Sequence, residues 1–313
     1  MTRNEKIKLV TFPILVLLVL SLISSFYDPT ENYSIGDERL DKVLNDLMME
    51  EKNSIDVVVL GDSLTYSGIS PYHLWDEYGY TSFVCGSPSQ MINNTYEMLE
   101  AVLFRQSPKV VLLETNVIYQ VTQQRSIVQS LFFQAFPVLR YHNNWKGSTP
   151  YSGSEIGTQD RYKGYVLRTA IKAGSDSGYM TPSDGVNEIA TVNKYYFGKI
   201  YDLCQENNIE LIIVSVPSTK YWNYPKHNAV VELAEEYGIK YWDLNIDENV
   251  DINWNVDTPD KGGHMNVHGA KKVTRRIGQL LSTETDSTLK DHRGDAAYEE
   301  WAKGWEEAKK RLK

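Results

Sequence analysis

Five short apolar runs, separated by long intervals, most constrain how this chain can fold. They are nearly continuous, rich in β-branched residues, and occupy residues 55–60, 82–85, 109–113, 210–214 and, more weakly, 240–243. Strands buried on both faces of a parallel sheet have this composition, whereas strands with one face in water alternate between apolar and polar residues. The runs therefore predict a parallel β-sheet in the body of the chain.

Helical patterns fill the intervals between these runs. Apolar residues recur at helical spacing over 90–104, 186–205 and 228–237, and a further helix is expected to end near Leu281. Parallel strands are joined by crossover connections, which are almost always right-handed. The alternation predicts an α/β fold, a doubly wound sandwich with helices on both faces of the sheet.

A long uncharged segment lies near the N-terminus. No charged residue occurs from Leu9 to Tyr27, three basic residues precede this segment, and Asp28 follows it. About 20 apolar residues cross a bilayer as a helix, and this distribution of charge favours a cytoplasmic N-terminus. We predict a single-pass anchor in the cell membrane with an extracellular domain beyond it. A signal peptide cleaved near Ser24 or Ser25 and a buried soluble helix are the alternatives.

Composition shifts divide the chain into four parts. We predict an anchor (1–28), a spacer with a short amphipathic helix (29–53), a catalytic domain (54–285) and a helical tail (286–313). Within the domain, residues 118–184 are rich in aromatic residues and glycine and lack a clear core strand. A stretch this long is unusual unless it is functional, so we predict an insertion that covers the active site.

The charge and the cysteines exclude several classes of partner. With 32 basic and 41 acidic side chains, the formal net charge is −9 and no basic stripe is present, which argues against nucleic-acid binding. The only cysteines, Cys85 and Cys204, are too few for a disulfide framework. We interpret them as small buried side chains, with a bridge as the alternative. Neither has metal-ligand spacing, and we expect no metal or cofactor.

A candidate nucleophile follows the first strand directly, in Gly61-Asp62-Ser63-Leu64. In open parallel sheets ligands gather beyond the carboxyl ends of the strands, so Ser63 is well placed to react. The motif differs from the Gly-x-Ser-x-Gly elbow because Thr65 replaces the second glycine. The alternative is that Asp62 and Ser63 only cap the following helix.

A candidate base lies far downstream, between a strand and a helix. His264 stands near Asp260 in a glycine-containing loop, in a chain with only six histidines. A serine hydroxyl needs a base, and the base needs an orienting group. A loop before a helix N-terminus would bring His264 to the same edge of the sheet as Ser63. The alternative is a solvent-exposed loop histidine.

Together these residues resemble the SGNH (GDSL-type) hydrolase superfamily over about residues 55–283. The resemblance implies a flavodoxin-like three-layer sandwich. It also implies that Ser63 is the nucleophile, that His264 is the general base and later the general acid, and that Asp260 orients the imidazole. The oxyanion hole would combine the backbone N–H groups of Ser63 and Gly86 with the side chain of Asn116.

Two departures from that family's pattern affect these assignments. Asp260 precedes His264 by four residues where the family usually has three, which leaves Asp257 as an alternative. Asn116 lies in Glu-Thr-Asn-Val, where many members have Gly-x-Asn-Asp. Ser63 and His264 therefore match the pattern best.

The N-terminal segment together with His-Met-Asn-x-x-Gly-Ala at 264–270 resembles a narrower, membrane-anchored group. It is related to the D-alanine-transfer protein of teichoic acid assembly and to polysaccharide O-acetylation proteins. The resemblance implies a cell-envelope glycan or glycopolymer as substrate and a multi-spanning membrane-bound O-acyltransferase as partner. Arg140 and His142 are candidate contacts to an anionic or sugar substrate, with ordinary loop residues as the equal alternative.

These features predict acyl transfer or ester hydrolysis through an acyl-serine. O-acylation of an extracellular polysaccharide or teichoic acid is the favoured function, because tethering and aromatic cover suit transfer to sugars. A carbohydrate esterase or deacetylase is the first alternative, since only the second acceptor differs, water instead of a sugar hydroxyl. The second is a catalytically inactive module that binds glycan or a partner, favoured by the displaced Asp260.

Overall fold

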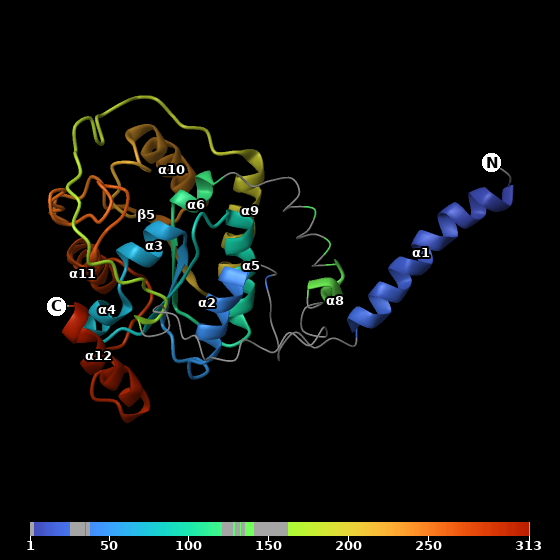
Figure 1. The fold of residues 1–313 in the computed structure, drawn as a ribbon, viewed down its shortest axis with the longest axis horizontal. Helices are drawn as coiled ribbons and strands as arrows, with labels where there is room; N and C mark the ends of the chain where they lie inside the picture. Colours follow the sequence, from blue (N-terminus) through green and yellow to red (C-terminus); the bar gives the residue numbers. More distant parts are fainter. Residues whose placement is uncertain are drawn as a thin grey trace.

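A parallel β-sheet organises the body of the protein (Figure 1). The computed structural model describes residues 3–25, 35, 38–120, 128, 132, 135–140 and 162–312. The five-stranded sheet has the order β2-β1-β3-β4-β5, with every neighbouring pair parallel. Its strands are β1 (Val57–Gly61), β2 (Ser82–Gly86), β3 (Val110–Glu114), β4 (Glu210–Ser215) and β5 (Lys240–Asp243). This flavodoxin-like order confirms the predicted α/β class.

Helices cover both faces of the sheet (Figure 1). On one face α11 (Val267–Thr283) packs against α3 (Ser63–Gly68) and α4 (Pro71–Tyr78). On the other, α5 (Ile92–Leu103) packs against α2 (Glu38–Met48) and α9 (Thr191–Glu206). The ring of Tyr237 in α10 (Tyr224–Tyr237) packs edge-on against Phe197 and Tyr201 of α9. The result is the predicted three-layer sandwich.

The strands form where the apolar runs predicted them because nearly every strand residue is buried between the two helical layers. Helix α9 begins at Thr191, whereas its apolar pattern starts at Val186. The backbone N–H of Asn187 donates to the carbonyl of Pro225 at 2.9 Å, which holds the preceding residues as a connection beside α10. Helix α4 was not predicted, although Pro71 at its first turn and left-handed Gly79 at its C-cap are boundary signals.

The two ends of the chain are helical. Helix α1 (Arg3–Ser25) contains one segment, Lys8–Ser25, that is long and apolar enough to cross a membrane, and an N-terminal signal sequence has the same properties. Helix α12 (Glu299–Leu312) follows a short 3₁₀ turn (Ala296–Tyr298) and packs against α4. Trp301 of α12 lies 5.5 Å from the ring of Trp75. The division of the chain into the four parts given above stays a prediction.

Cys85 lies in β2 and Cys204 in α9, and both are buried and unpaired. Burial raises the pKa of both thiols, that of Cys204 to about 12. The prediction that they are small buried side chains is therefore confirmed, and they take no part in the site.

Candidate active site

Ser63 sits on the turn between β1 and α3. The strand ends at Gly61, and the Asp62 carboxylate accepts a hydrogen bond from the backbone N–H of Leu64 at 2.9 Å, which caps α3. A Cβ on Gly61 would lie 1.8 Å from Oγ1 of Thr65, so only glycine fits this close turn. Asp62 therefore caps the helix, as the alternative interpretation held, while the same turn presents Ser63 at the carboxyl edge of the sheet.

Three predicted side chains meet in one hydrogen-bonded line. Oγ of Ser63 lies 2.8 Å from Nε2 of His264, and Nδ1 of His264 lies 2.5 Å from Oδ2 of Asp260. The other carboxylate oxygen of Asp260 accepts the backbone N–H groups of Gly263 at 3.0 Å and His264 at 2.9 Å. This arrangement leaves Nε2 as an acceptor for the serine proton.

The loop that carries His264 is fixed by its own polar side chains. Asn266 caps α11 by accepting from the backbone of His268 and Gly269, and its amide donates to the carbonyls of Val256 and Ala170. Oγ1 of Thr258 accepts the Gly262 N–H at 2.7 Å. The ammonium of Lys220 donates to the carbonyl of Asp260. The imidazole is therefore held by a pre-formed loop.

The carboxylate of Asp260 is held in its ionised form. Burial alone would raise its pKa, but hydrogen bonds to the side chain and backbone of His264 outweigh this, and Lys220 adds a favourable charge, so the pKa lies below its ordinary value. Asp257, the alternative, is 1% exposed and bonds instead to the Lys272 ammonium and the Asn253 N–H, each at 2.7 Å. The structure places Asp260, not Asp257, beside the imidazole.

The predicted oxyanion donors surround the same turn. A Cβ on Gly86 would lie 3.1 Å from the carbonyl oxygen of Asp62, so β2 ends directly against the residue before Ser63. Asn116 begins the short helix α6 (Asn116–Tyr119), and its amide nitrogen donates to Oδ2 of Asp62 at 2.7 Å. That amide carries two hydrogens, and the bond to Asp62 uses one. The arrangement is compatible with the three donors named above.

Asp62 links the turn to the end of β3 and was not expected to have this role. Besides Asn116, its Oδ2 accepts from the Gln120 amide at 3.0 Å. Burial raises the pKa of Asp62, while the hydrogen bonds from Leu64, Asn116 and Gln120 and the nearby His264 oppose that rise. Asp62 thus positions Asn116 as well as capping α3.

Residues 162–174, here called the strap, run along the site from β2 to the His264 loop. The strap's backbone is bonded in turn to Val84, Tyr66, Val267, Thr258 and Lys261 over distances of 2.7–3.1 Å. The φ of Gly164 is +84°, and a Cβ there would lie 1.9 Å from the carbonyl oxygen of Val84. This part of the predicted insertion therefore packs beside the triad, as part of the site's wall.

Two side chains beside the triad were missed by sequence reasoning. Tyr221 is 41% exposed, and its ring lies 5.6 Å from that of His264 in an edge-on arrangement. Arg168, from the strap, places its guanidinium carbon 5.9 Å from the ring centre of Tyr66. Neither belongs to a periodic pattern or a motif, so only their positions in the fold reveal them.

The two predicted substrate contacts from the insertion are not brought to the triad by any contact in the described part of the chain. Arg140 ends the short helix α8 (Pro137–Arg140), whose Val138 N–H lies 3.3 Å from Oγ of Ser24 in α1. The side chain of Arg140 and all of His142 lie outside the described residues. Their contact with substrate stays a prediction.

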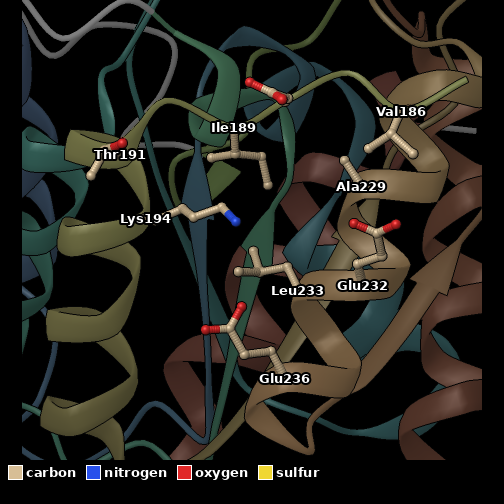
Figure 2. A pocket seen from close by; sticks show the side chains of 9 residues that line it. Val186, Ile189, Thr191, Lys194, Ala229, Glu232, Leu233 and Glu236 are labelled. Atoms are coloured by element: carbon tan, nitrogen blue, oxygen red, sulfur yellow. The ribbon is translucent and has the colours of Figure 1, made fainter.

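A separate cavity of about 550 Å³ lies between the start of α9 and α10 (Figure 2). Lys194 reaches into it from α9, and α10 supplies Glu232 and Glu236. None of the predicted site residues lines it. Among the residues that the structure describes, no group of three or more His, Cys, Asp or Glu side chains is arranged to hold a metal ion.

Comparisons with known proteins show that this chain is similar to several solved structures and to no family model or curated protein. Among similar structures, a GDSL-like lipase from Bacteroides thetaiotaomicron is 12% identical, with 80% of this chain and 100% of that chain covered and a TM-score of 0.42. An esterase from Pseudoalteromonas is 10% identical, with coverages of 72% and 93% and a TM-score of 0.37.

A family 3 carbohydrate esterase from Clostridium thermocellum is 15% identical, with coverages of 72% and 98% and a TM-score of 0.35. Similarities at this level carry no argument about the chemistry of this chain. The function proposed below therefore rests on the geometry of Ser63, His264 and Asp260.

Proposed function

We propose that this protein is a serine-dependent acyl enzyme that cleaves an ester and passes the acyl group to an acceptor hydroxyl. The observation that carries the proposal is the continuous line from Oγ of Ser63 through His264 to the Asp260 carboxylate, at 2.8 and 2.5 Å. These distances are those of a nucleophile, its base and an orienting acid.

The chemistry follows from these positions. As Oγ of Ser63 attacks the ester carbonyl, Nε2 of His264 takes its proton, and the carbonyl oxygen becomes an oxyanion. Donors from Ser63, Gly86 and Asn116 would bind that oxyanion, each contributing about 3 kcal/mol to transition-state stabilisation. The imidazolium then protonates the leaving alcohol, which leaves the acyl group on Ser63. In the second half, His264 deprotonates a hydroxyl or water that attacks the acyl-serine.

Labelling with a fluorophosphonate tests this chemistry. The full chain in detergent is expected to react covalently at Ser63, because a phosphonate mimics the tetrahedral intermediate. Ser63→Ala should abolish labelling, while Ser67→Ala, a buried serine one turn further along α3, should retain it. Absence of Ser63-dependent labelling in the folded wild-type protein would contradict the proposal and favour an inactive binding module.

The acceptor that we propose is a hydroxyl of an extracellular cell-envelope glycan or glycopolymer. Three features support transfer: the apolar helix α1, which would hold the domain near the envelope; the strap, which covers one side of the triad; and the exposed ring of Tyr221 beside His264. Aromatic faces suit sugar rings, and a covered site limits competing water. A multi-spanning membrane-bound O-acyltransferase is the partner that would supply the acyl group.

Comparison of the envelope polymer from cells that carry wild-type protein or Ser63→Ala separates transfer from hydrolysis. Mass spectrometry is expected to show less polymer-bound acyl group in the variant. More acyl group in the variant would identify the wild-type protein as an esterase instead. An unchanged acyl content would contradict both functions for that polymer.

A further inference from the structure

Arg168 lies beside Tyr66, one turn after the proposed nucleophile, and has no carboxylate counter-ion among the described residues. It is half-buried in the strap, and its Nε is fully buried and makes no hydrogen bond. In the described part of the chain, no carboxylate lies within ion-pair distance of its guanidinium. A half-buried arginine without a carboxylate partner is unusual because charges removed from water are normally paired with an opposite charge.

The strap aims this side chain at the site. The N–H of Val166 donates to the carbonyl of Tyr66 at 2.7 Å, and the carbonyl of Arg168 accepts from the N–H of Val267 at 2.8 Å. The backbone of Arg168 is thus fixed between the helix that begins with Ser63 and the helix that follows the His264 loop. Its guanidinium lies over the Tyr66 ring.

Tyr66 joins Arg168 to the nucleophile. It stands one turn after Ser63 in α3 and is 6% exposed. Burial raises the pKa of its hydroxyl, and the nearby Arg168 and Ser63 both act against that rise. The guanidinium and the serine are therefore neighbours of one phenol group, at the edge where an ester must bind.

We propose that Arg168 binds an anionic group, a carboxylate or a phosphate, on the ester that reacts with Ser63. An arginine presents a planar fork of N–H donors that matches both anions. This proposal rests on the acyl-serine function above and specifies its substrate class: esters that carry a negative charge within reach of the scissile bond. Arg168 is a substrate-binding residue here.

Matched esters test the proposal on the full chain in detergent. For an anion in the leaving group, 4-acetoxybenzoate and 4-acetoxyphenyl phosphate are compared with neutral methyl 4-acetoxybenzoate. For an anion in the acyl group, mono-4-nitrophenyl succinate is compared with 4-nitrophenyl butyrate. The readout is the ratio of kcat/KM for the anionic ester to that for its neutral partner, so differences in intrinsic reactivity cancel between variants.

Arg168→Gln is expected to lower this ratio at least about tenfold for one of the anionic esters, since hydrogen bonds to charged groups have this strength. The ester that responds identifies carboxylate or phosphate, and the leaving or acyl side. Lys172→Gln, which removes an exposed cation from the same strap, should leave the ratio unchanged.

An equal loss for anionic and neutral esters in Arg168→Gln, with its unfolding midpoint intact, would overturn the proposal and leave Arg168 a positioning residue for Tyr66. An unchanged ratio for every pair would overturn it as well. If the wild-type protein hydrolyses none of the esters and resists fluorophosphonate, the acyl-serine function fails. Labelling of the wild-type protein by fluorophosphonate therefore distinguishes failure of the Arg168 proposal, in which Ser63 still reacts, from failure of the acyl-serine function, in which it does not.

Discussion

Asp260 holds His264 at two points, accepting from Nδ1 of its ring at 2.5 Å and from its backbone N–H at 2.9 Å. One carboxylate thus fixes both the rotation of the ring and the position of the residue that carries it. Four residues separate Asp260 from His264 in sequence number, and the loop between them turns at Gly262, whose φ is +92°, so that the carboxylate reaches the imidazole. The displacement of Asp260 therefore gives no support to an inactive module.

Asp260→Asn is expected to lower kcat by about 10³–10⁴. An amide can turn its N–H₂ group toward Nδ1, which favours the tautomer that cannot accept the Ser63 proton at Nε2. Steady-state hydrolysis of 4-nitrophenyl acetate measures the effect, with Ser63→Ala as the background rate. A loss smaller than tenfold would show that Asp260 does not orient the base.

Asp257→Asn tests the alternative orienting acid and is expected to affect stability instead of catalysis. Asp257 is buried and paired with Lys272, so its neutralisation leaves a partly buried ammonium without its partner. We expect a loss of about 3 kcal/mol in the free energy of unfolding, measured by urea titration, with kcat per folded molecule retained. A loss of kcat as large as that of Asp260→Asn would show that Asp257 contributes to catalysis.

His73 makes the fold sensitive to acid. Burial in α4 lowers the pKa of its imidazole from 6.5 to about 4, and the nearby Lys271 acts in the same direction. Between these values the unfolded chain binds a proton that the folded protein does not, so stability is complete above pH 6.5 and falls as the pH drops toward 4. The shift corresponds to about 3 kcal/mol.

His73→Phe should remove this part of the pH dependence. Its ring would still pack against Trp305, which lies 6.1 Å from the imidazole. Urea unfolding at pH 7 and pH 4 measures both proteins. The wild type should lose about 3 kcal/mol more than the variant, and parallel curves would show that His73 does not titrate between these limits.

Gly164→Ala is expected to destabilise the strap much more than Gly178→Ala. Both glycines have positive φ, at +84° and +75°, so both variants incur backbone strain of about 1 kcal/mol. Only at Gly164 would the new Cβ meet another backbone, 1.9 Å from the carbonyl oxygen of Val84, which adds about 1–3 kcal/mol. Equal unfolding free energies for the two variants would show that the strap shifts away from Val84 without a measurable cost.

The same pair also tests how the strap affects the site. Movement of Gly164 should displace the strap residues beside Tyr66, so Gly164→Ala is expected to lower kcat/KM. Gly178→Ala should retain wild-type kcat/KM, because nothing lies within 4 Å of its added Cβ. Hydrolysis of a neutral aryl ester by folded protein provides the measurement.

The sheet could be predicted from the sequence because its strands are buried on both faces. Such strands have nearly continuous apolar sequences, which can be recognised without a structure. Ser63 and His264 could be placed for a related reason: each lies on a connection whose neighbours are predictable elements. The choice between Asp260 and Asp257 could not be made in advance. It depends on Lys272, which neutralises Asp257 from the second turn of α11.

Arg168 could not be predicted because the strap has no helical or strand repeat. Its path is set by single backbone hydrogen bonds to Tyr66 and Val267, residues far from it in sequence. Such bonds use the peptide groups that every residue has, so the sequence carries no signal for them. The role of Asp62 beyond its cap was hidden for a similar reason, since Gln120 reaches it from the end of α6.

The hydrogen bond between Ser63 and His264 joins residues 201 positions apart in the chain. Strand β1 directly precedes Ser63 and strands β2 to β5 lie between the two residues, so the nucleophile and its base meet only when the sheet has formed. During synthesis Ser63 leaves the ribosome well before His264 does. A chain that ends between these two residues has the serine hydroxyl but lacks its base. Reactivity at Ser63 therefore requires the fold to extend through the loop that carries His264.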